Sequence, residues 1–498
     1  MTNKSKITGF GGLILVAVLV LSSCSKSYYD INTDPNNSTN AGIDLVLSNA
    51  LKISAAPQVS TYAVFSEWMN YWSPSGSYAI NSSDGSSYKQ TTDFADNNGL
   101  WTNIYRNLSD YEYIEKTAAA SNQYFYVAAA KTMKAYLFQQ LVDMFNNVPY
   151  AEALKGTANL QPKYDNGKDI YEALSTELGT AVTLFQRQDA TGSSTQDILF
   201  AGNKSYWAKF ANTLRLRLLI RQTEISGRSA YIQSEINKIL ANGAGFLNTD
   251  AGVNPGYAAS SGKQNPFYGF AYSLTGTYTQ DFWRAGKFVI SFSQAHNDPR
   301  YKRWYAPISD GSYVGTTVGS TSNPSGNLSS TFGPGVLKSV SQPAVIFSAA
   351  ESYFLQAEAI LRGFLTGSDL TMYNNGVQAS FTYLGAGSAT TYTSQAGDRE
   401  TNYAACTTFN EKLNCIMRQK YLAMQDVTTF EAFADYRRLF YLGLPFTASI
   451  PISVNPQRDG NAIPTRILYP TIEYQTNLEN VSAQGTINHH GSKVFWMP

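Results

Sequence analysis

Residues 122–145 have the sequence NQYFYVAAAKTMKAYLFQQLVDMF. Phe125, Ala129 and Met133 recur at the four-residue spacing that places side chains on one face of an α-helix. The preceding segment, about 99–119, has the same kind of apolar spacing, and a short polar turn separates the two. We therefore expect a helical hairpin in which the small side chain of Ala129 lies where the helices approach closely.

The same pattern recurs along the chain. Helix pairs are expected at about 99–145, 168–225, 344–384 and 409–441. Shorter helical patterns begin near Asp44 and run from Val64 to Trp72. Such pairs resemble tetratricopeptide units, although the strict 34-residue spacing of those repeats is absent. The sequence predicts an all-α, mainly helical fold of degenerate helix-pair repeats.

A long insertion of about 245–342 interrupts the repeats. It is rich in Gly, Ser, Thr, Asn and Tyr and has few charged residues. A loop-rich stretch of this length is usually either functional or disordered, and its many aromatic residues argue against disorder. A shorter segment at 73–98 has a similar composition. We expect these loops to carry the function.

The first residues have the pattern of an export signal. Lys4 and Lys6 precede an apolar run from Phe10 to Leu21, which is too short for a membrane-spanning helix of about 20 residues. Leu21-Ser22-Ser23-Cys24 resembles a bacterial lipobox, in which the cysteine is lipidated. The alternative is an ordinary secretory signal with a chance cysteine. We expect a lipoprotein signal at 1–23, a tether at 24–42 and a folded domain at 43–498.

Composition excludes several classes of function. Removing the signal removes two of the 37 basic residues and none of the 36 acidic ones, so the net charge becomes −1. No basic surface for nucleic acid is expected. The chain has three histidines and no CxxC, which argues against a metal site, and we expect no cofactor. Cys406 and Cys415 could form a local disulfide or remain free thiols.

The aromatic content indicates a binding surface. The chain has 34 Tyr, 26 Phe and 7 Trp, and Tyr and Trp provide rigid contact area that suits sugar rings. Trp68 is expected in the core, whereas Trp72, four residues later at a helix end, could be exposed. The candidate ligand contacts from the two loops are Trp72, Tyr78, Tyr88, Tyr278 and Trp283.

Catalytic residues are not evident. Glu351 and Glu358 share a helix face, and a glycosidase needs two carboxylates on either side of a sugar, but Glu358 lies among core-facing residues. No serine-hydrolase, zinc-protease or nucleotide-binding motif is present. Asp298-Pro299-Arg300 is interpreted as a structural corner in which Arg300 binds a nearby carboxylate. We expect no catalytic residue.

Several longer motifs resemble those of the SusD/RagB lipoproteins. The helix ESYFLQAEAILRG, the segment IMRQKYLA and the run FEAFADYRR all occur in the family's order, with Phe433 where the family often has Trp. A closing PTRILYP with three polar residues after it, and DINTDPN near the start, agree as well. These motifs are at Glu351–Gly363, Ile416–Ala423, Phe430–Arg438, Pro464–Pro470, Glu473, Asn477, Asn480, Asp30–Asn36 and Phe145–Tyr150.

The resemblance implies a function. Such proteins are noncatalytic lipoproteins of the outer-membrane surface of Bacteroidota that cover a SusC-like TonB-dependent transporter and capture oligosaccharides, or peptides in some branches. The resemblance assigns a role to one residue of this sequence, Cys24, as the site of lipidation. It assigns no sugar-binding residue, because the sugar-binding loops differ between members of the family. We expect glycan capture for the transporter. The alternatives are the same role for oligopeptides, a surface glycosidase and a structural adhesin.

Overall fold

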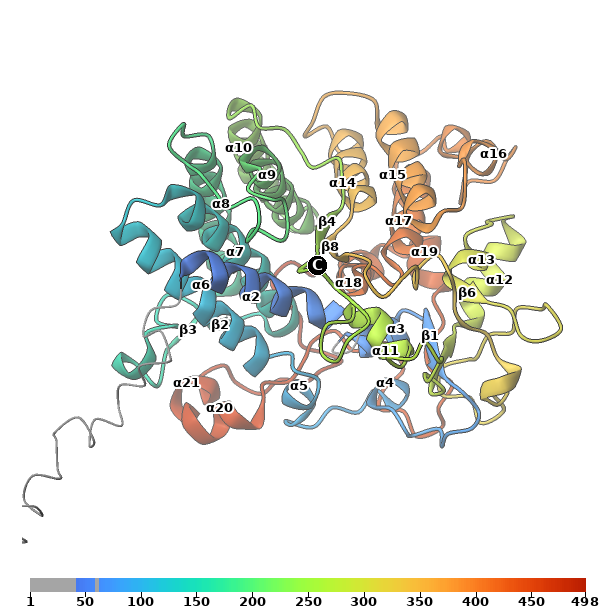
Figure 1. Cartoon of the computed structure of the whole chain (residues 1–498). Coiled ribbons are helices and arrows are strands. Elements are labelled where there is room, and N and C mark those ends of the chain that lie inside the picture. Colours follow the sequence, from blue (N-terminus) through green and yellow to red (C-terminus); the bar gives the residue numbers. More distant parts are fainter. Residues whose placement is uncertain (1–41, 59–61) are drawn as a thin grey trace, which may run out of the picture.

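The computed structural model describes residues 42–58 and 62–498 (Figure 1). The predicted signal, Cys24 and almost all of the predicted tether lie outside the described residues. The chain is mainly helical, as predicted, and the strands among the described residues form two-stranded pairs. The first elements are α2 (Ile43–Ala55), η2 (Ala56–Gln58), α3 (Ala63–Trp68), β1 (Trp72–Pro74), α4 (Asp84–Ser87) and α5 (Phe94–Asn97).

The first two predicted helix pairs are confirmed. Their helices pack consecutively, α6 on α7, α7 on α8 and α8 on α9. Asn122, with a φ of +56°, makes the turn of the first hairpin, and the side chain of Asn203 caps α9 by accepting hydrogen bonds from two backbone N–H groups. These elements are α6 (Thr102–Ala120), α7 (Tyr124–Phe145), β2 (Val148–Pro149), η3 (Gly156–Ala158), β3 (Tyr164–Asp165), α8 (Gly167–Phe185) and α9 (Lys204–Arg221).

One helix was not predicted. α10 (Ser229–Ala241) follows the second pair and packs against α8 and α9. Its buried residues include Ile232, Ile236 and Ile239, which have helical spacing. The apolar spacing that indicates this helix was therefore present in the sequence.

The insertion is loop-rich, as predicted, but contains short helices and strands. Its strands return to distant parts of the chain: β5 pairs with β1, and β4 pairs with β8, both antiparallel. The elements from 245 to 347 are β4 (Ala251–Val253), α11 (Pro266–Ala271), β5 (Trp283–Ala285), α12 (Lys287–Ala295), α13 (Tyr301–Trp304), β6 (Tyr305–Ala306), η4 (Gly326–Leu328), β7 (Thr331–Phe332) and β8 (Ala344–Phe347).

The third and fourth predicted pairs are present with one correction. Residues 344–347, expected at the start of a helix, form the strand β8, and Ser348 then caps α14 by accepting a hydrogen bond from Glu351 N. A capping box of Thr408 and Glu411 begins α17. The elements are α14 (Ala349–Leu361), α15 (Asp369–Leu384), α16 (Thr390–Thr393), η5 (Tyr403–Ala405), α17 (Phe409–Met424), α18 (Thr429–Leu439) and η6 (Phe440–Leu442).

The last residues return to the middle of the molecule, where Figure 1 marks the C-terminus. Trp496 is fully buried there, and its indole Nε1 donates a hydrogen bond to Asp143 Oδ1 in α7, 2.7 Å away. The C-terminal segment is thus part of the core. Its short helices are α19 (Pro445–Ser449), α20 (Thr471–Thr476) and α21 (Leu478–Ser482).

Candidate ligand-binding site

A strand pair joins the two loops that sequence analysis selected. In the β1–β5 register, Trp72 lies opposite Ala285 and Pro74 lies opposite Trp283. Backbone contacts continue the association, because Ser75 N donates to Phe282 O at 2.8 Å. The loop after β1 and the insertion are therefore fixed to each other, although they are distant in sequence.

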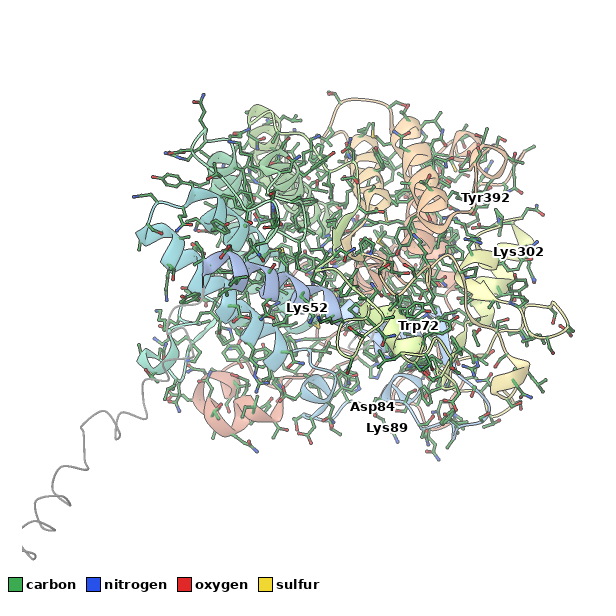
Figure 2. The ribbon with its side chains drawn as sticks, viewed as in Figure 1. Lys52, Trp72, Asp84, Lys89, Lys302 and Tyr392 are labelled. Carbon is green, nitrogen blue, oxygen red and sulfur yellow. The ribbon has the colours of Figure 1, made fainter. Side chains whose placement is uncertain are left out.

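The prediction that Trp72 is an exposed indole at a helix end is wrong. α3 ends at Trp68, so Trp72 lies in a strand, and only 1% of it is exposed. Its ring contacts rings of the insertion, and its Nε1 donates a hydrogen bond to Asp426 Oδ1 at 2.6 Å. Figure 2 labels it beside α11. Trp68 is buried, as predicted.

Tyr88 is also not available to a ligand. It is 1% exposed and adopts a left-handed conformation with a φ of +58°. Its hydroxyl accepts a hydrogen bond from Ser453 N at 2.7 Å, and its ring lies edge-on to Trp68 and to His490. Tyr88 therefore links the early loop to the C-terminal segment inside the protein.

Tyr78 and Trp283 lie together at the surface with Phe282. Tyr78 is 36% exposed, its hydroxyl donates to Asp281 Oδ1 at 2.6 Å, and its ring is 4.8 Å from that of Phe282. The half-buried Phe282 and Trp283 rings are 4.7 Å apart. We refer to Tyr78, Phe282 and Trp283 as the aromatic edge. Sequence reasoning did not select Phe282, although it directly precedes Trp283.

Tyr278 is half-buried and belongs to a neighbouring group of rings. Its ring lies edge-on to Tyr272 at 5.2 Å, and Tyr272 stacks on Tyr268 at 4.7 Å. Burial raises the pKa of the Tyr278 hydroxyl to about 12. This position supports the packing of the insertion more directly than it offers a face to a ligand.

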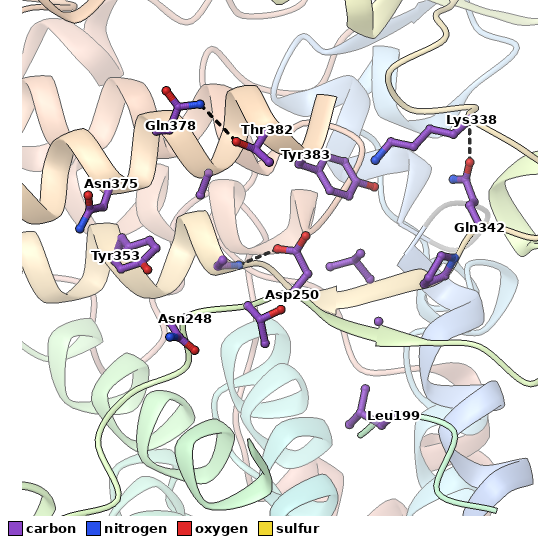
Figure 3. A pocket seen from close by; sticks show the side chains of 16 residues that line it. Leu199, Asn248, Asp250, Lys338, Gln342, Tyr353, Asn375, Gln378, Thr382 and Tyr383 are labelled. Carbon is purple, nitrogen blue, oxygen red and sulfur yellow. Dashed lines mark hydrogen bonds between the residues drawn. The ribbon is translucent and has the colours of Figure 1, made fainter. Parts of the chain in front are cut away.

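A cavity of about 710 Å³ lies between the β4–β8 pair and helices α14 and α15 (Figure 3). Sequence reasoning did not find it, although α15 places several amide and hydroxyl side chains toward it. Its lining combines polar side chains with apolar surface and includes two tyrosines. The lining residues include Asn248, Asp250, Lys338, Tyr353, Asn375 and Tyr383.

Two charged groups in this cavity have fixed positions. Asp250 Oδ1 accepts a hydrogen bond from Ala349 N, 2.8 Å away, at the start of α14. Lys338 Nζ lies 3.7 Å from the centre of the Tyr383 ring, a cation–π contact. Burial raises the pKa of the Asp250 carboxyl and lowers the pKa of the Lys338 ammonium group.

Three other polar side chains of the cavity make no hydrogen bond to the described residues. Within residues 42–58 and 62–498, the side chains of Asn248, Tyr353 and Asn375 make no hydrogen bond. Amides and a phenol of this kind can both donate and accept, and therefore suit sugar hydroxyls, acetamido groups or a peptide backbone.

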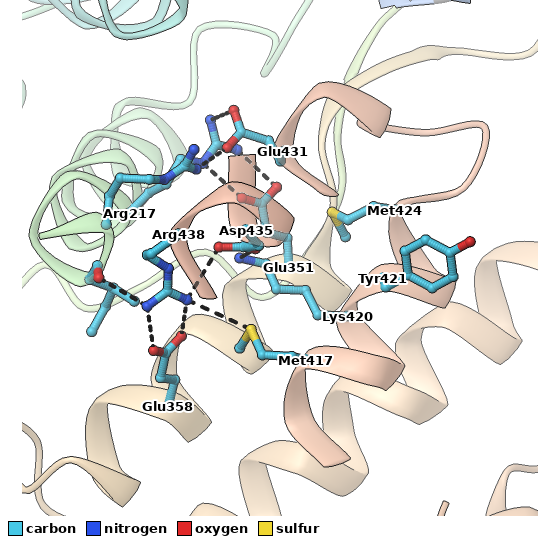
Figure 4. Close-up of polar contacts among 12 residues, drawn as sticks. Arg217, Glu351, Glu358, Met417, Lys420, Tyr421, Met424, Glu431, Asp435 and Arg438 are labelled. Atoms are coloured by element: carbon cyan, nitrogen blue, oxygen red, sulfur yellow. Dashed lines mark hydrogen bonds and ion pairs between the residues drawn. The ribbon is translucent and has the colours of Figure 1, made fainter. Parts of the chain in front are cut away.

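The carboxylates considered for catalysis are structural. Glu351 and Glu358 are fully buried, and each receives a two-bond contact from an arginine: Arg217 at 2.7 and 2.8 Å, and Arg438 at 2.7 and 2.8 Å (Figure 4). Burial alone would raise the pKa of Glu358, but Arg438 and a second arginine lower it below its ordinary value. Glu358, held ionised in this way, is not suited to act as a general acid.

The predicted structural corner is confirmed. Asp298 and Arg300 are fully buried and form an ion pair at 2.7 Å. Arg300 also donates to Gln419 Oε1 at 2.6 Å, which joins the insertion to α17.

Across the described helices, none combines the length and the apolar character needed to cross a membrane.

Comparisons with known proteins agree with this fold. The model of a family described as "Starch-binding associating with outer membrane", SusD-like, matches residues 35–470. No curated protein sequence matches the chain.

Solved structures resemble it over nearly the whole chain. A chitin-binding protein is 26% identical, covers 91% of this chain and 99% of its own, and has a TM-score of 0.71. A SusD-like protein from Bacteroides thetaiotaomicron is 21% identical, with coverage of 92% and 99% and a TM-score of 0.74. A chitin-binding SusD homolog from Flavobacterium johnsoniae is 23% identical, with coverage of 90% and 98% and a TM-score of 0.71. This chain belongs to the SusD-like family.

Proposed function

We propose that this protein is a noncatalytic, surface-exposed lipoprotein of the outer membrane, anchored at Cys24, that captures an oligosaccharide and passes it to a SusC-like TonB-dependent transporter. The observation that carries the proposal is the aromatic edge. Three adjoining rings are held at the surface by the β1–β5 pair, with the exposed carboxylate of Asp281 beside them. Sugars offer C–H patches to aromatic rings and hydroxyls to carboxylates and amides.

Oligosaccharides of N-acetylglucosamine are the first ligands to test. Two of the solved relatives carry the description chitin-binding, and one of them is 26% identical to this chain. The family description names starch, so oligosaccharides of α-linked glucose are the second class. Both classes are neutral, which fits a chain whose mature net charge is close to zero.

Oligopeptide capture for the same transporter is the second candidate. The polar cavity favours it, since the free amides of Asn248 and Asn375 can pair with a peptide backbone. The aromatic edge favours a sugar. Substitutions at the aromatic edge and in the cavity can therefore distinguish the two ligand classes.

The test is calorimetric binding to the chain from Ser25 onward, which contains every described residue. Chitohexaose, maltohexaose and a mixed peptide library are the ligands. Tyr78→Ala and Trp283→Ala remove parts of the aromatic edge, and Asn375→Ala changes the cavity. Tyr206→Ala is the matched control, because Tyr206 on α9 is 37% exposed, against 36% for Tyr78.

We expect one of the oligosaccharides to bind, and each aromatic-edge variant to weaken binding about tenfold, or about 1.4 kcal/mol. Tyr206→Ala and Asn375→Ala should bind as the unchanged chain does. Peptide binding that is lost in Asn375→Ala would replace the glycan proposal with the peptide one. Copurification of the full-length lipoprotein with an outer-membrane transporter tests the delivery step, and loss of uptake after gene deletion separates capture from a purely structural role.

A further inference from the structure

Two of the three histidines in the chain meet one carboxylate. His489 and His490 lie in the segment after α21, and Asp459 lies in the loop before α20. One ligand atom from each of the three residues lies within 4.8 Å of the others, and His489 Nε2 is 3.1 Å from Asp459 Oδ2. The two imidazole ring centres are 4.4 Å apart.

The backbone fixes these side chains. Thr465 N and Arg466 N both donate to His489 O, at 2.7 and 3.2 Å. His490 N donates to Asn488 Oδ1 at 2.8 Å in a tight turn. Gly460 directly follows Asp459, and a Cβ placed on it would lie 2.9 Å from the His490 ring. The His490 ring can therefore pack against the loop only because residue 460 has no side chain.

The ring nitrogens lack adequate partners within the described parts of the chain. Neither nitrogen of His490 makes a hydrogen bond of normal geometry, and the only contact of His489 Nε2 in that part of the chain is its ion pair with Asp459; all three nitrogens are inaccessible to water. The backbone groups of Asp459 and Ala462 are weak hydrogen-bond partners of the His490 ring, and neither contact has normal hydrogen-bond geometry. A buried polar atom without a partner costs on the order of 1–3 kcal/mol, so such atoms usually hold a water molecule or an ion.

We propose that Asp459, His489 and His490 bind a divalent transition-metal ion, with Zn²⁺ as the best match. Two imidazoles and one carboxylate suit Zn²⁺ far better than Ca²⁺ or Mg²⁺, which prefer oxygen ligands. Three protein ligands leave a fourth position for water or another donor. The low numbers of Cys and His argued against a metal site in the sequence, but adjacent histidines need only one carboxylate brought in by the fold.

The metal would fasten the C-terminal segment to the rest of the domain. Asp459 N donates to Ser87 O at 2.7 Å, and Asn455 Nδ2 donates to Asn81 Oδ1 at 2.7 Å. The loop that carries Asp459 therefore lies against the residues between Tyr78 and Tyr88. A ligand that binds only the folded state raises the free energy of unfolding. The effect to measure is a higher melting temperature.

The experiment uses the untagged chain from Ser25 onward, stripped of metal with a chelator. Zn²⁺ is titrated in competition with a chromophoric chelator, and Co²⁺ serves as a spectroscopic probe. We expect one equivalent of Zn²⁺ to bind and the melting temperature to rise. His490→Ala and Asp459→Asn should each weaken Zn²⁺ binding at least tenfold.

His296→Ala is the matched control. His296 Nδ1 lies 2.7 Å from Asp398 Oδ2, so it is also a histidine paired with a carboxylate, but no third ligand joins it among the described residues. Its loss should leave Zn²⁺ binding unchanged. Circular dichroism in chelator shows whether each variant is folded, and His490→Gln replaces any variant that is not.

Three results would overturn the proposal. The folded, unchanged chain could bind no stoichiometric Zn²⁺, which would mean that the nitrogens hold water. Zn²⁺ binding could be equal in the unchanged chain and in His490→Ala. His296→Ala could lower the affinity as much as His490→Ala does, which would place the metal elsewhere.

Discussion

The indole Nε1 of Trp72 donates a hydrogen bond to the carboxylate of Asp426 across 2.6 Å, and both side chains are buried. Trp72 lies in the first strand of the domain, and Asp426 lies between α17 and α18. Gln425 Nε2 contacts the other carboxylate oxygen at 3.2 Å. Burial raises the pKa of Asp426 to about 7, because two neutral donors compensate only part of the lost hydration.

This contact predicts a pH-dependent stability. Near pH 4 Asp426 is largely neutral in the folded chain, so burial costs little. As the pH rises from 4 to 7, the unfolded chain ionises first, and the folded chain loses stability. Above pH 7 the penalty is complete, at most about 4 kcal/mol. The free energy of unfolding should therefore fall from pH 4 to pH 8 through this group.

Asp426→Asn should remove that penalty. Its amide oxygen still accepts from Trp72, and Gln425 Oε1, which is buried without a partner among the described residues, can accept from the new amide after a flip. Asn also tolerates the φ of +60° at this position. We expect near-equal stability at pH 4 and a variant more stable by a few kcal/mol at pH 8, measured by urea unfolding. A variant less stable at pH 8 would contradict this assignment.

Gly286→Ala should separate the two loops that form the aromatic edge. A Cβ on Gly286 would lie 1.8 Å from Asn70 O, a backbone atom that cannot move aside, and Gly286 N donates to Tyr71 O at 2.8 Å. We expect a loss of at least about 2 kcal/mol in stability and weaker ligand binding. Gly269→Ala in α11 is the control, since its Cβ meets only a side chain at 3.4 Å. Equal melting temperatures for the two variants would refute the prediction.

Local pattern predicted the helices well, and α15 ends at Leu384, where the third helix pair was predicted to end. The local pattern did not predict whether a side chain is exposed where residues distant in sequence cover it. Trp72 is buried because β5 pairs beside it and Asp426 binds its nitrogen, and Tyr88 is buried because Ser453 binds its hydroxyl. No window of sequence around Trp72 contains these partners.

The same limit applies to the candidate sites. The aromatic edge was found in part, because Tyr78 and Trp283 lie in the two aromatic-rich loops, but their adjacency depends on the β1–β5 pair. The cavity was missed because its lining comes from separate elements, such as Asp250, Lys338 and Asn375. Cys24 lies outside the described residues, so lipidation stays a prediction.

The buried ionic network should be costly to break on one side only. Arg438 binds Glu358 and lies 3.2 Å from Asp435, and none of the three side chains is more than 6% exposed. Arg438→Met leaves two buried carboxylates with fewer partners, which should cost about 3–5 kcal/mol. Lys116→Ala, which removes a surface pair with Glu112, should cost less than about 1 kcal/mol. Thermal unfolding measures both, and a similar shift for each would mean that the network contributes little.

Cys406 and Cys415 are both free and buried, which favours the thiol alternative over a disulfide. A hydrogen bond with Cys415 lowers the pKa of Cys406, whereas burial raises the pKa of Cys415. Because reactivity requires an accessible thiolate, we expect neither thiol to react quickly with Ellman's reagent in the folded chain from Ser25 onward. Two thiols should react after denaturation, with or without prior reduction. The Cys406→Ser variant should give one. If the denatured chain shows two thiols only after reduction, the pair is a disulfide.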